Sequence, residues 1–193
     1  MLFRSQAIAD LRKSSGVKAA KKASRVAAEG VVMTRIAEDG NYGVVVEVNS
    51  ETDFAARDDN FLTFANQALD QAFADPEADV DALLNAGLED ARQALVQKIG
   101  ENINVRRVQR LKFDDANQGI VESYVHNNNR IAVLIALQGG DESLARDIAM
   151  HVAAVNPMVV RAEDVPKDVL AHETEIDSCR PSGFVAWLAL RAI

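Results

Sequence analysis

Hydrophobic and polar positions along this chain follow two spacings, one typical of strands and one typical of helices. Apolar residues that alternate with polar ones, or that form a short β-branched or strongly apolar run, predict strands, and apolar residues that recur every three or four positions predict helices with one buried face. Turn-forming residues such as Asp39-Gly40-Asn41 and Asp75-Pro76 separate these segments. The expected order in the first part is strand 31–36, strand 42–48, helix 59–73, helix 80–84, helix 88–99 and strand 105–113.

The same order begins a second time after residue 119. Strands are expected at 120–126 and 130–137, and an amphipathic helix is expected at 143–155, ending before Asn156-Pro157. Residues 41–48 and 129–136 also occupy corresponding places in the two copies. We therefore predict an α+β fold in which a duplicated strand-hairpin plus helix unit forms two subdomains, the second one truncated.

One connection distinguishes the two copies. In the first copy residues 50–60 lie between the second strand and the helix, whereas the second copy has only residues 138–141 there. Because the shorter connection is enough to build the unit, we expect the longer one to carry the specific function.

Composition suggests further boundaries at both ends of the chain. Trp187 and Cys179, the only residues of their types, lie in a segment that differs from the rest and indicates a frame-shifted or wrongly joined end. The expected organisation is a helical and basic arm at 1–30, a first core subdomain at 31–115, a truncated second core subdomain at 116–176 and an atypical tail at 177–193.

Charge limits the classes of partner. The net charge of −8 argues against general nucleic-acid binding. Basic residues nevertheless gather at 18–25, where they form either a solvated helix face or a patch for an acidic partner surface. A nucleic-acid-binding module that uses 18–25 stays open as an alternative. The arginines at 106, 107 and 110 are expected to be exposed on their strand.

No apolar stretch reaches the length of about 20 residues that spans a bilayer, so we expect no membrane partner. A single cysteine and the lack of a secretory pattern at the N-terminus favour a cytoplasmic location.

A large aromatic residue stands in the polar connection at 50–60. Phe54 is flanked by Asp53 and Arg57 just after a β-branched run that should be buried. An aromatic ring among charges at the end of a core strand is suited to anchor a protein interface. Ser50 followed three positions later by Asp53 also fits a helix capping box, which would explain both residues without a binding role.

Motifs of catalysis are missing. The chain has no phosphate loop, no dinucleotide fingerprint, no nucleophile elbow and no H-E-x-x-H motif, and its three histidines are far apart in sequence. We therefore expect a protein that is not an enzyme and needs no cofactor or metal. A divalent-metal-dependent hydrolase that uses the acidic turn at 51–59 is the remaining enzymatic alternative.

Residues 47–57, with Phe61 following, closely resemble the core signature of the elongation factor Ts family, the guanine-nucleotide exchange factors of elongation factor Tu. Residues 19–30, 98–107 and 148–154 extend the resemblance in the same order. The family's core is likewise a duplicated α+β unit. The family's small N-terminal helical domain and its C-terminal part have no counterpart here, and the resemblance is expected to end after Glu175.

The resemblance also implies a function and a site. It implies binding to elongation factor Tu, both GDP-bound and nucleotide-free, and promotion of GDP release during translation elongation by disturbance of the Mg²⁺ and phosphate site. Phe54 would be a wedge at the nucleotide site of elongation factor Tu, and Asp53 would help shift the elements that hold Mg²⁺. His151 would be a secondary partner contact. The segment that reaches the partner would be Thr52, Asp53, Phe54 and Ala55.

Overall fold

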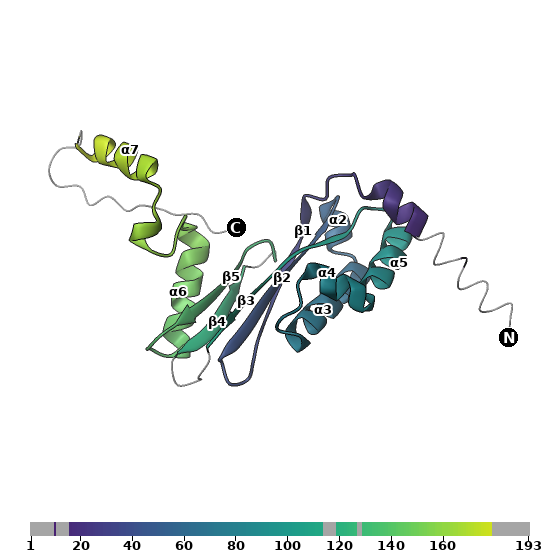
Figure 1. Ribbon diagram of the computed structural model, residues 1–193, viewed down its shortest axis with the longest axis horizontal. Helices are drawn as coiled ribbons and strands as arrows, with labels where there is room; N and C mark the ends of the chain where they lie inside the picture. The colour runs from purple at the N-terminus through teal and green to yellow at the C-terminus, as the bar shows by residue number, and fades with distance from the viewer. Residues whose placement is uncertain (1–9, 11–15, 114–118, 127–128, 179–193) are drawn as a thin grey trace.

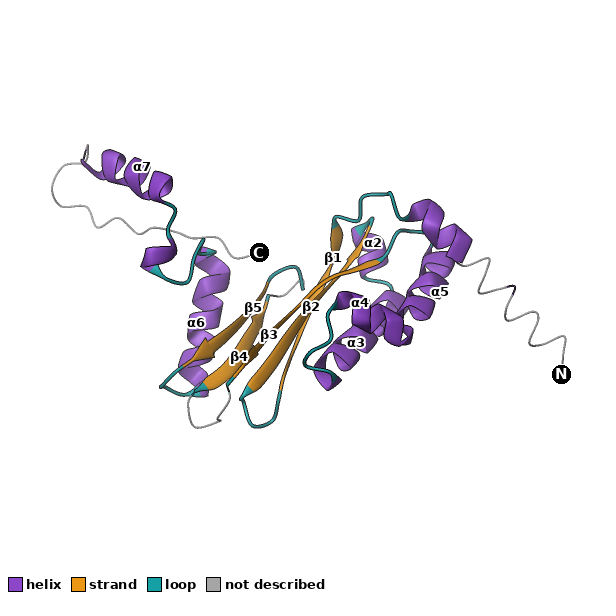
Figure 2. Ribbon diagram, in the orientation of Figure 1, coloured by secondary structure: helices purple, strands orange, loops and turns teal. Residues whose placement is uncertain are grey.

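The computed structural model describes residue 10 and residues 16–113, 119–126 and 129–178. In this part of the chain antiparallel sheets combine with helices, which confirms the α+β class (Figure 1; Figure 2). The strands are β1 Glu29–Ile36, β2 Tyr42–Ser50, β3 Asn104–Lys112, β4 Ile120–Val125 and β5 Ala132–Leu137. The helices are α2 Asp53–Ala56, α3 Asp59–Ala74, α4 Val80–Leu83, α5 Glu89–Ile99, α6 Glu142–Val155 and α7 Lys167–Ser178.

Helix α3 packs on the buried face of β2, the central strand of the first sheet. The sheet has the order β1-β2-β3, and Val44, Val46 and Val48 of β2 are completely buried on one face. Burying a side chain of this kind stabilises the fold by about 1.5–3 kcal/mol. The residues that α3 buries recur at helical spacing: Phe61, Phe64, Ala65, Ala68, Leu69 and Ala72.

The opposite face of this sheet receives the antiparallel β4–β5 hairpin. Gly43 of β2 permits the close approach, because a Cβ at this position would lie 2.7 Å from Ile36 Cδ1 and 2.8 Å from Leu134 Cδ1 and Val121 Cγ1. Helix α6 packs on the hairpin. The layers therefore run from α3, α4 and α5 through the first sheet and the hairpin to α6 (Figure 1).

Most expected elements lie within two residues of their observed bounds, and one difference concerns the helices after α3. The helices expected at 80–84 and 88–99 follow each other without an extended loop, through a wide turn at Leu84–Leu88. Gly87 makes this turn possible because its φ of +104° is a conformation that other residues rarely adopt. Helix α7 was not expected from the sequence.

The expectation that all three arginines of β3 are exposed is wrong for two of them. Arg106 is exposed, but Arg107 and Arg110 are half-buried. The guanidinium of Arg107 donates to the carboxylate of Glu47, and that of Arg110 donates to the carbonyl of Ala72. The last carbonyls of a helix lack partners within the helix, so Arg110 satisfies one near the end of α3.

Some expectations fall outside the described residues. The beginning of the N-terminal helical arm, the loop residues 114–118 and the tail from 179 onward, with Cys179 and Trp187, belong to this group. Within the described part of the arm, residues 16–22 are helical.

Candidate functional site

The segment that carries the signature forms a short helix directly after β2. Phe54 of this helix, α2, is 79% exposed, whereas Ala55 and Ala56 are only 5% and 6% exposed. The two alanines pack α2 against β1 and β2 and leave the aromatic ring in solvent. Ala55 is therefore part of the packing beneath the helix rather than of its exposed surface.

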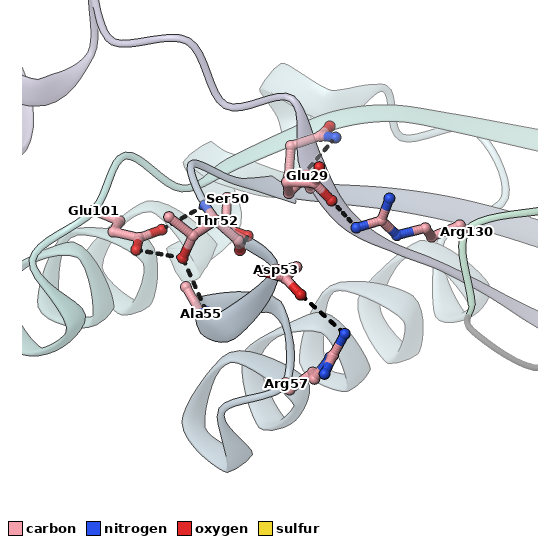
Figure 3. Close-up of polar contacts among 9 residues, drawn as sticks. Glu29, Ser50, Thr52, Asp53, Ala55, Arg57, Glu101 and Arg130 are labelled. Atoms are coloured by element: carbon pink, nitrogen blue, oxygen red, sulfur yellow. Dashed lines mark hydrogen bonds and ion pairs between the residues drawn. The ribbon is translucent and has the colours of Figure 1, made fainter.

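The cap of α2 differs from the capping box considered above. Ser50 belongs to β2, which extends two residues further than expected, and its hydroxyl donates to the carbonyl of Thr52 at 2.9 Å. The N-cap is Thr52, whose Oγ1 accepts from the amide of Ala55 at 3.3 Å. Asp53 forms an ion pair with Arg57 at 2.9 Å, one helical turn later (Figure 3). The Ser50–Asp53 capping box is therefore wrong.

A second stretch of the resemblance lies beside this cap. The Oε2 and Oε1 atoms of Glu101 accept hydrogen bonds from the amide and the hydroxyl of Thr52 at 3.0 and 2.7 Å (Figure 3). The amide of Asn102 donates to Oε1 of Glu51 at 2.6 Å. Residues 98–107 and 47–57 thus meet at the end of β2. Sequence reasoning missed Glu101 as a site residue, although it lies within a stretch that carries the resemblance.

The basic arm joins the same contact. The side-chain amide of Asn102 donates to the carbonyl of Arg25 at 2.7 Å, and the Arg25 guanidinium lies 3.6 Å from the carboxylate of Glu51. The ammonium of Lys22 donates to the carbonyl of Gly100. Part of the basic cluster at 18–25 therefore stabilises the fold, while Lys18 stays exposed.

A buried carboxylate lies on β2, three residues before Ser50. Glu47 of β2 is 8% exposed, and its carboxylate accepts from Arg106 at 3.1 Å and from Arg107. Burial raises the pKa of Glu47, but hydrogen bonds from Asn49, Arg107 and Arg106 and the charge of Arg107 lower it more. The net effect is a pKa below the ordinary value, so Glu47 is ionised at neutral pH.

A cleft of about 410 Å³ opens next to α2. It lies between α2 and the connection from β4 to β5, where Arg130 forms an ion pair with Glu29 (Figure 3). The residues that line it are Gly30, Val31, Asp53, Ala56, Arg57, Leu62, Asn129 and Arg130.

His151 lies on another part of the molecule. It is exposed on α6, which packs on β4 and β5, whereas α2 packs on β1 and β2. Figure 1 shows these two helices on different sides of the sheets. The structure therefore brings Thr52, Asp53, Phe54 and Ala55 together but does not bring His151 to them.

The carboxylates of the acidic turn mostly bond to protein groups. Asp58 accepts from the amide of Asn60 at 2.8 Å as the N-cap of α3, and hydrogen bonds from Asn60 lower its pKa. In the described residues, no group of three or more His, Cys, Asp and Glu side chains is arranged to hold a metal ion. Within the same residues, no helix has the length and apolar character needed to cross a membrane.

An exposed aromatic ring on a short helix whose neighbouring alanines are buried, beside an open cleft with charged edges, is typical of a protein-contact site. The molecule is thus an α+β protein with a candidate protein-contact surface at the end of β2.

Comparisons with known proteins give the family. Residues 51–183 match the family model described as "Elongation factor TS". The chain is 61% identical over 171 residues to elongation factor Ts of Hahella chejuensis, covering 89% of this chain and 58% of that protein. It is 59% identical over 175 residues to elongation factor Ts of Saccharophagus degradans, covering 91% of this chain and 59% of that protein. The chain belongs to the elongation factor Ts family, a family of translation elongation factors.

The chain therefore spans less than two thirds of the length of these relatives. The family match continues through residue 183, so the expectation that the resemblance ends after Glu175 is wrong. The matched region includes all of α7, which runs to Ser178.

Proposed function

We propose that this chain binds elongation factor Tu and promotes the release of GDP from it, in the cytoplasm, during translation elongation. The observation that carries the proposal is Phe54, which is 79% exposed on a helix whose neighbouring alanines are buried. Family membership supplies the partner. The segment Thr52, Asp53, Phe54 and Ala55 is the proposed contact with the nucleotide-binding part of elongation factor Tu, with Ala55 supporting the exposed residues from beneath.

The proposed mechanism uses binding energy and no covalent chemistry. The ring of Phe54 enters between side chains of the partner and loses its contact with water, which makes it an anchor. Asp53 pairs with the guanidinium of Arg57, which is 76% exposed, so this pair can be rearranged at small cost. Together these residues shift the elements that hold Mg²⁺. Loss of Mg²⁺ removes a large charge that stabilises the bound diphosphate, and GDP leaves faster.

The same proposal predicts how the factor leaves. Coupling between two ligands is reciprocal, so a factor that weakens GDP binding is itself bound more weakly when GDP is present. GTP that refills the site then releases the factor from elongation factor Tu. Each round returns the chain unchanged.

We also infer two subdomains related by duplication, at 31–115 and 116–176. The support is that both the β1–β2 and the β4–β5 antiparallel hairpins are followed by a helix, α3 and α6. His151 on α6 is the proposed secondary contact. A contact on the second unit would let the chain hold elongation factor Tu at two separate surfaces.

The two alternatives from the sequence receive no specific support. A nucleic-acid-binding module would need the basic residues at 18–25 to be free, but Lys22 and Arg25 bond within the fold. A hydrolase would need open carboxylates in the turn at 51–59, but Glu51 and Asp58 accept backbone amides. We therefore propose no direct contact with nucleic acid and no metal chemistry.

Binding and release measurements test the proposal. Titration of the full chain with elongation factor Tu should give about 5- to 150-fold tighter binding to the nucleotide-free form than to the GDP-bound form, the usual range of coupling between ligands. Release of a fluorescent GDP, followed by stopped flow with an excess of unlabelled GDP, should speed up as the chain is added. Equal affinity for the two forms, with an unchanged release rate, would contradict the proposed function.

A further inference from the structure

Helix α2 is too short to hold its own orientation. It spans four residues, Asp53–Ala56, and an isolated helix of this length is not stable in water. The buried Ala55 and Ala56 fix its lower side, but small side chains constrain rotation weakly. The direction of the exposed Phe54 ring therefore depends on what holds the ends of the helix.

The N-terminal end is held by a charge from far away in the sequence. Both carboxylate oxygens of Glu101 accept from the same residue, Thr52, one from its amide at 3.0 Å and one from its hydroxyl at 2.7 Å (Figure 3). Hydrogen bonds to a carboxylate are stronger than those between neutral groups. Because the Thr52 hydroxyl donates to Glu101, its oxygen faces the amide of Ala55 with its lone pairs and caps the helix.

A matching contact runs in the opposite direction. Glu51, the residue before Thr52, accepts from the amide of Asn102, the residue after Glu101, at 2.6 Å. Each glutamate thus binds the backbone beside the other glutamate. We call these four residues, Glu51, Thr52, Glu101 and Asn102, the carboxylate–amide clasp. Two contacts in opposite directions fix both the spacing and the relative rotation of the two segments.

The base of the clasp is firmly packed. Asn102 and Ile103 are 1% and 0% exposed, and Gly100 ends α5 with a φ of +90°. The carbonyl of Gly100 accepts from Lys22. Glu101 therefore projects from a turn that is anchored on both sides, which allows it to hold Thr52 in one position.

We infer that Glu101 is a positioning residue for Phe54: through the clasp it sets the orientation in which α2 presents the aromatic ring to elongation factor Tu. This inference rests on the proposed function. Glu101 touches no part of the partner in this account, and it acts through Thr52 alone. Preorganisation of this kind lowers the cost of ordering the anchor when the complex forms.

The test compares substitutions at Glu101 with a matched loss of a cap elsewhere. Glu101→Ala removes both bonds to Thr52. Glu101→Gln keeps one oxygen that can accept from the Thr52 amide, but its NH₂ group cannot accept from the hydroxyl. Asp79→Ala is the control, because Asp79 caps α4, another four-residue helix, through the amide of Ala82 at 2.8 Å.

Three measurements on the full chain are compared: amide hydrogen exchange of Thr52 by NMR, the ¹⁹F NMR signal of 4-fluorophenylalanine placed at 54, and the GDP-release rate at a fixed concentration of factor well below saturation. In Glu101→Ala, we expect exchange of Thr52 to rise and the release rate to fall, each by about tenfold. The fluorine signal should shift toward that of a freely rotating ring. Glu101→Gln should lie between, and Asp79→Ala should leave all three measurements as in the unsubstituted chain.

Two results would overturn the inference in different ways. If Phe54→Ala slows GDP release but Glu101→Ala leaves Thr52 exchange and the release rate unchanged, Glu101 is not a positioning residue and the proposed function stands. If Phe54→Ala leaves GDP release unchanged, the proposed function of α2 fails and the inference fails with it. If Asp79→Ala slows GDP release as much as Glu101→Ala does, the slower release follows from a general loss of stability. That result would also overturn the inference.

Discussion

Each of the two hairpins is connected to the helix that follows it, and the two connections differ in length and in how they are held. The connection from β5 to α6 uses residues 138–141 and turns through Gly139 and Gly140, whose φ angles are +80° and +84°. The connection from β2 to α3 uses residues 51–58, contains α2 and is bonded to residues 98–107. The first of these only closes a turn. The second is built to hold one exposed aromatic ring in place.

The shorter connection only reverses the chain direction, whereas the longer one also presents a side chain to solvent, and their hydrogen bonds differ accordingly. Asp141 caps α6 by accepting from the amide of Leu144 at 2.8 Å, a contact between residues only three positions apart. Thr52 caps α2 with support from Glu101, 49 positions later in the chain. Long-range support is needed where a short helix must keep a fixed orientation, and it is not needed where a turn simply leads into a long helix.

The largest expected loss of stability comes from a substitution in α3, compared with one in α6, the helices that follow the two connections. Phe61, near the start of α3, is completely buried, whereas Leu144, near the start of α6, is 47% exposed. Phe61→Ala should lower the free energy of unfolding by about 3–5 kcal/mol, because it leaves a cavity in the core. Leu144→Ala should lower it by less than about 1 kcal/mol. Chemical denaturation measures both, and equal losses would contradict the assignment of the core to α3.

A smaller loss of stability is expected from a substitution in β2, the strand that leads into the longer connection. Glu47 in β2 is buried with Arg106 and Arg107, and Glu47→Gln should lower the free energy of unfolding at pH 7 by about 2 kcal/mol. Because the pKa of Glu47 is lowered on folding, its ionised form stabilises the fold above the ordinary value of 4.5. This stabilisation is lost as the pH falls through the lower pKa of the folded state.

Denaturation from pH 7 to about pH 3 checks this expectation. The stability difference between the unsubstituted chain and Glu47→Gln should shrink below pH 4.5. Glu142→Gln is the control, since Glu142 is an exposed residue in the first turn of α6 and should change little at any pH. A stability difference that stays constant down to the lowest pH would show that the carboxylate charge of Glu47 is not involved.

The smallest effect is expected in the shorter connection. Gly140→Ala should lower the free energy of unfolding by about 1 kcal/mol, because alanine is strained at a φ of +84°. The added Cβ would lie 2.8 Å from Cδ2 of Leu144, a flexible side chain that can move aside. GDP release should be unchanged. A clear loss of exchange activity with little loss of stability would mean that this connection also takes part in function.

The sequence predicted the local features of this fold better than its long-range contacts. The helical period of apolar residues gave the bounds of α3 closely, because α3 buries one face. The β-branched run in 42–48 gave β2 to within two residues, because this strand is covered on both faces. The exposure of Phe54 followed from its charged neighbours. The contact of Thr52 with Glu101 could not be predicted, because it joins residues 49 positions apart through side chains that look like ordinary surface groups. The half-burial of Arg107 was missed for the same reason, since it depends on Glu47 in a neighbouring strand.

The rate of GDP release from elongation factor Tu at a fixed concentration of Phe54→Ala well below saturation tests the central claim most directly. Leu144→Ala is the matched control, because it removes an exposed apolar side chain from the start of the helix after the other connection. Loss of an aromatic anchor costs about 2 kcal/mol or more, so Phe54→Ala should release GDP about 30-fold more slowly than the unsubstituted chain. Leu144→Ala should match the unsubstituted chain, and both variants should stay folded. A Phe54→Ala variant that releases GDP as fast as the Leu144→Ala variant would contradict the account.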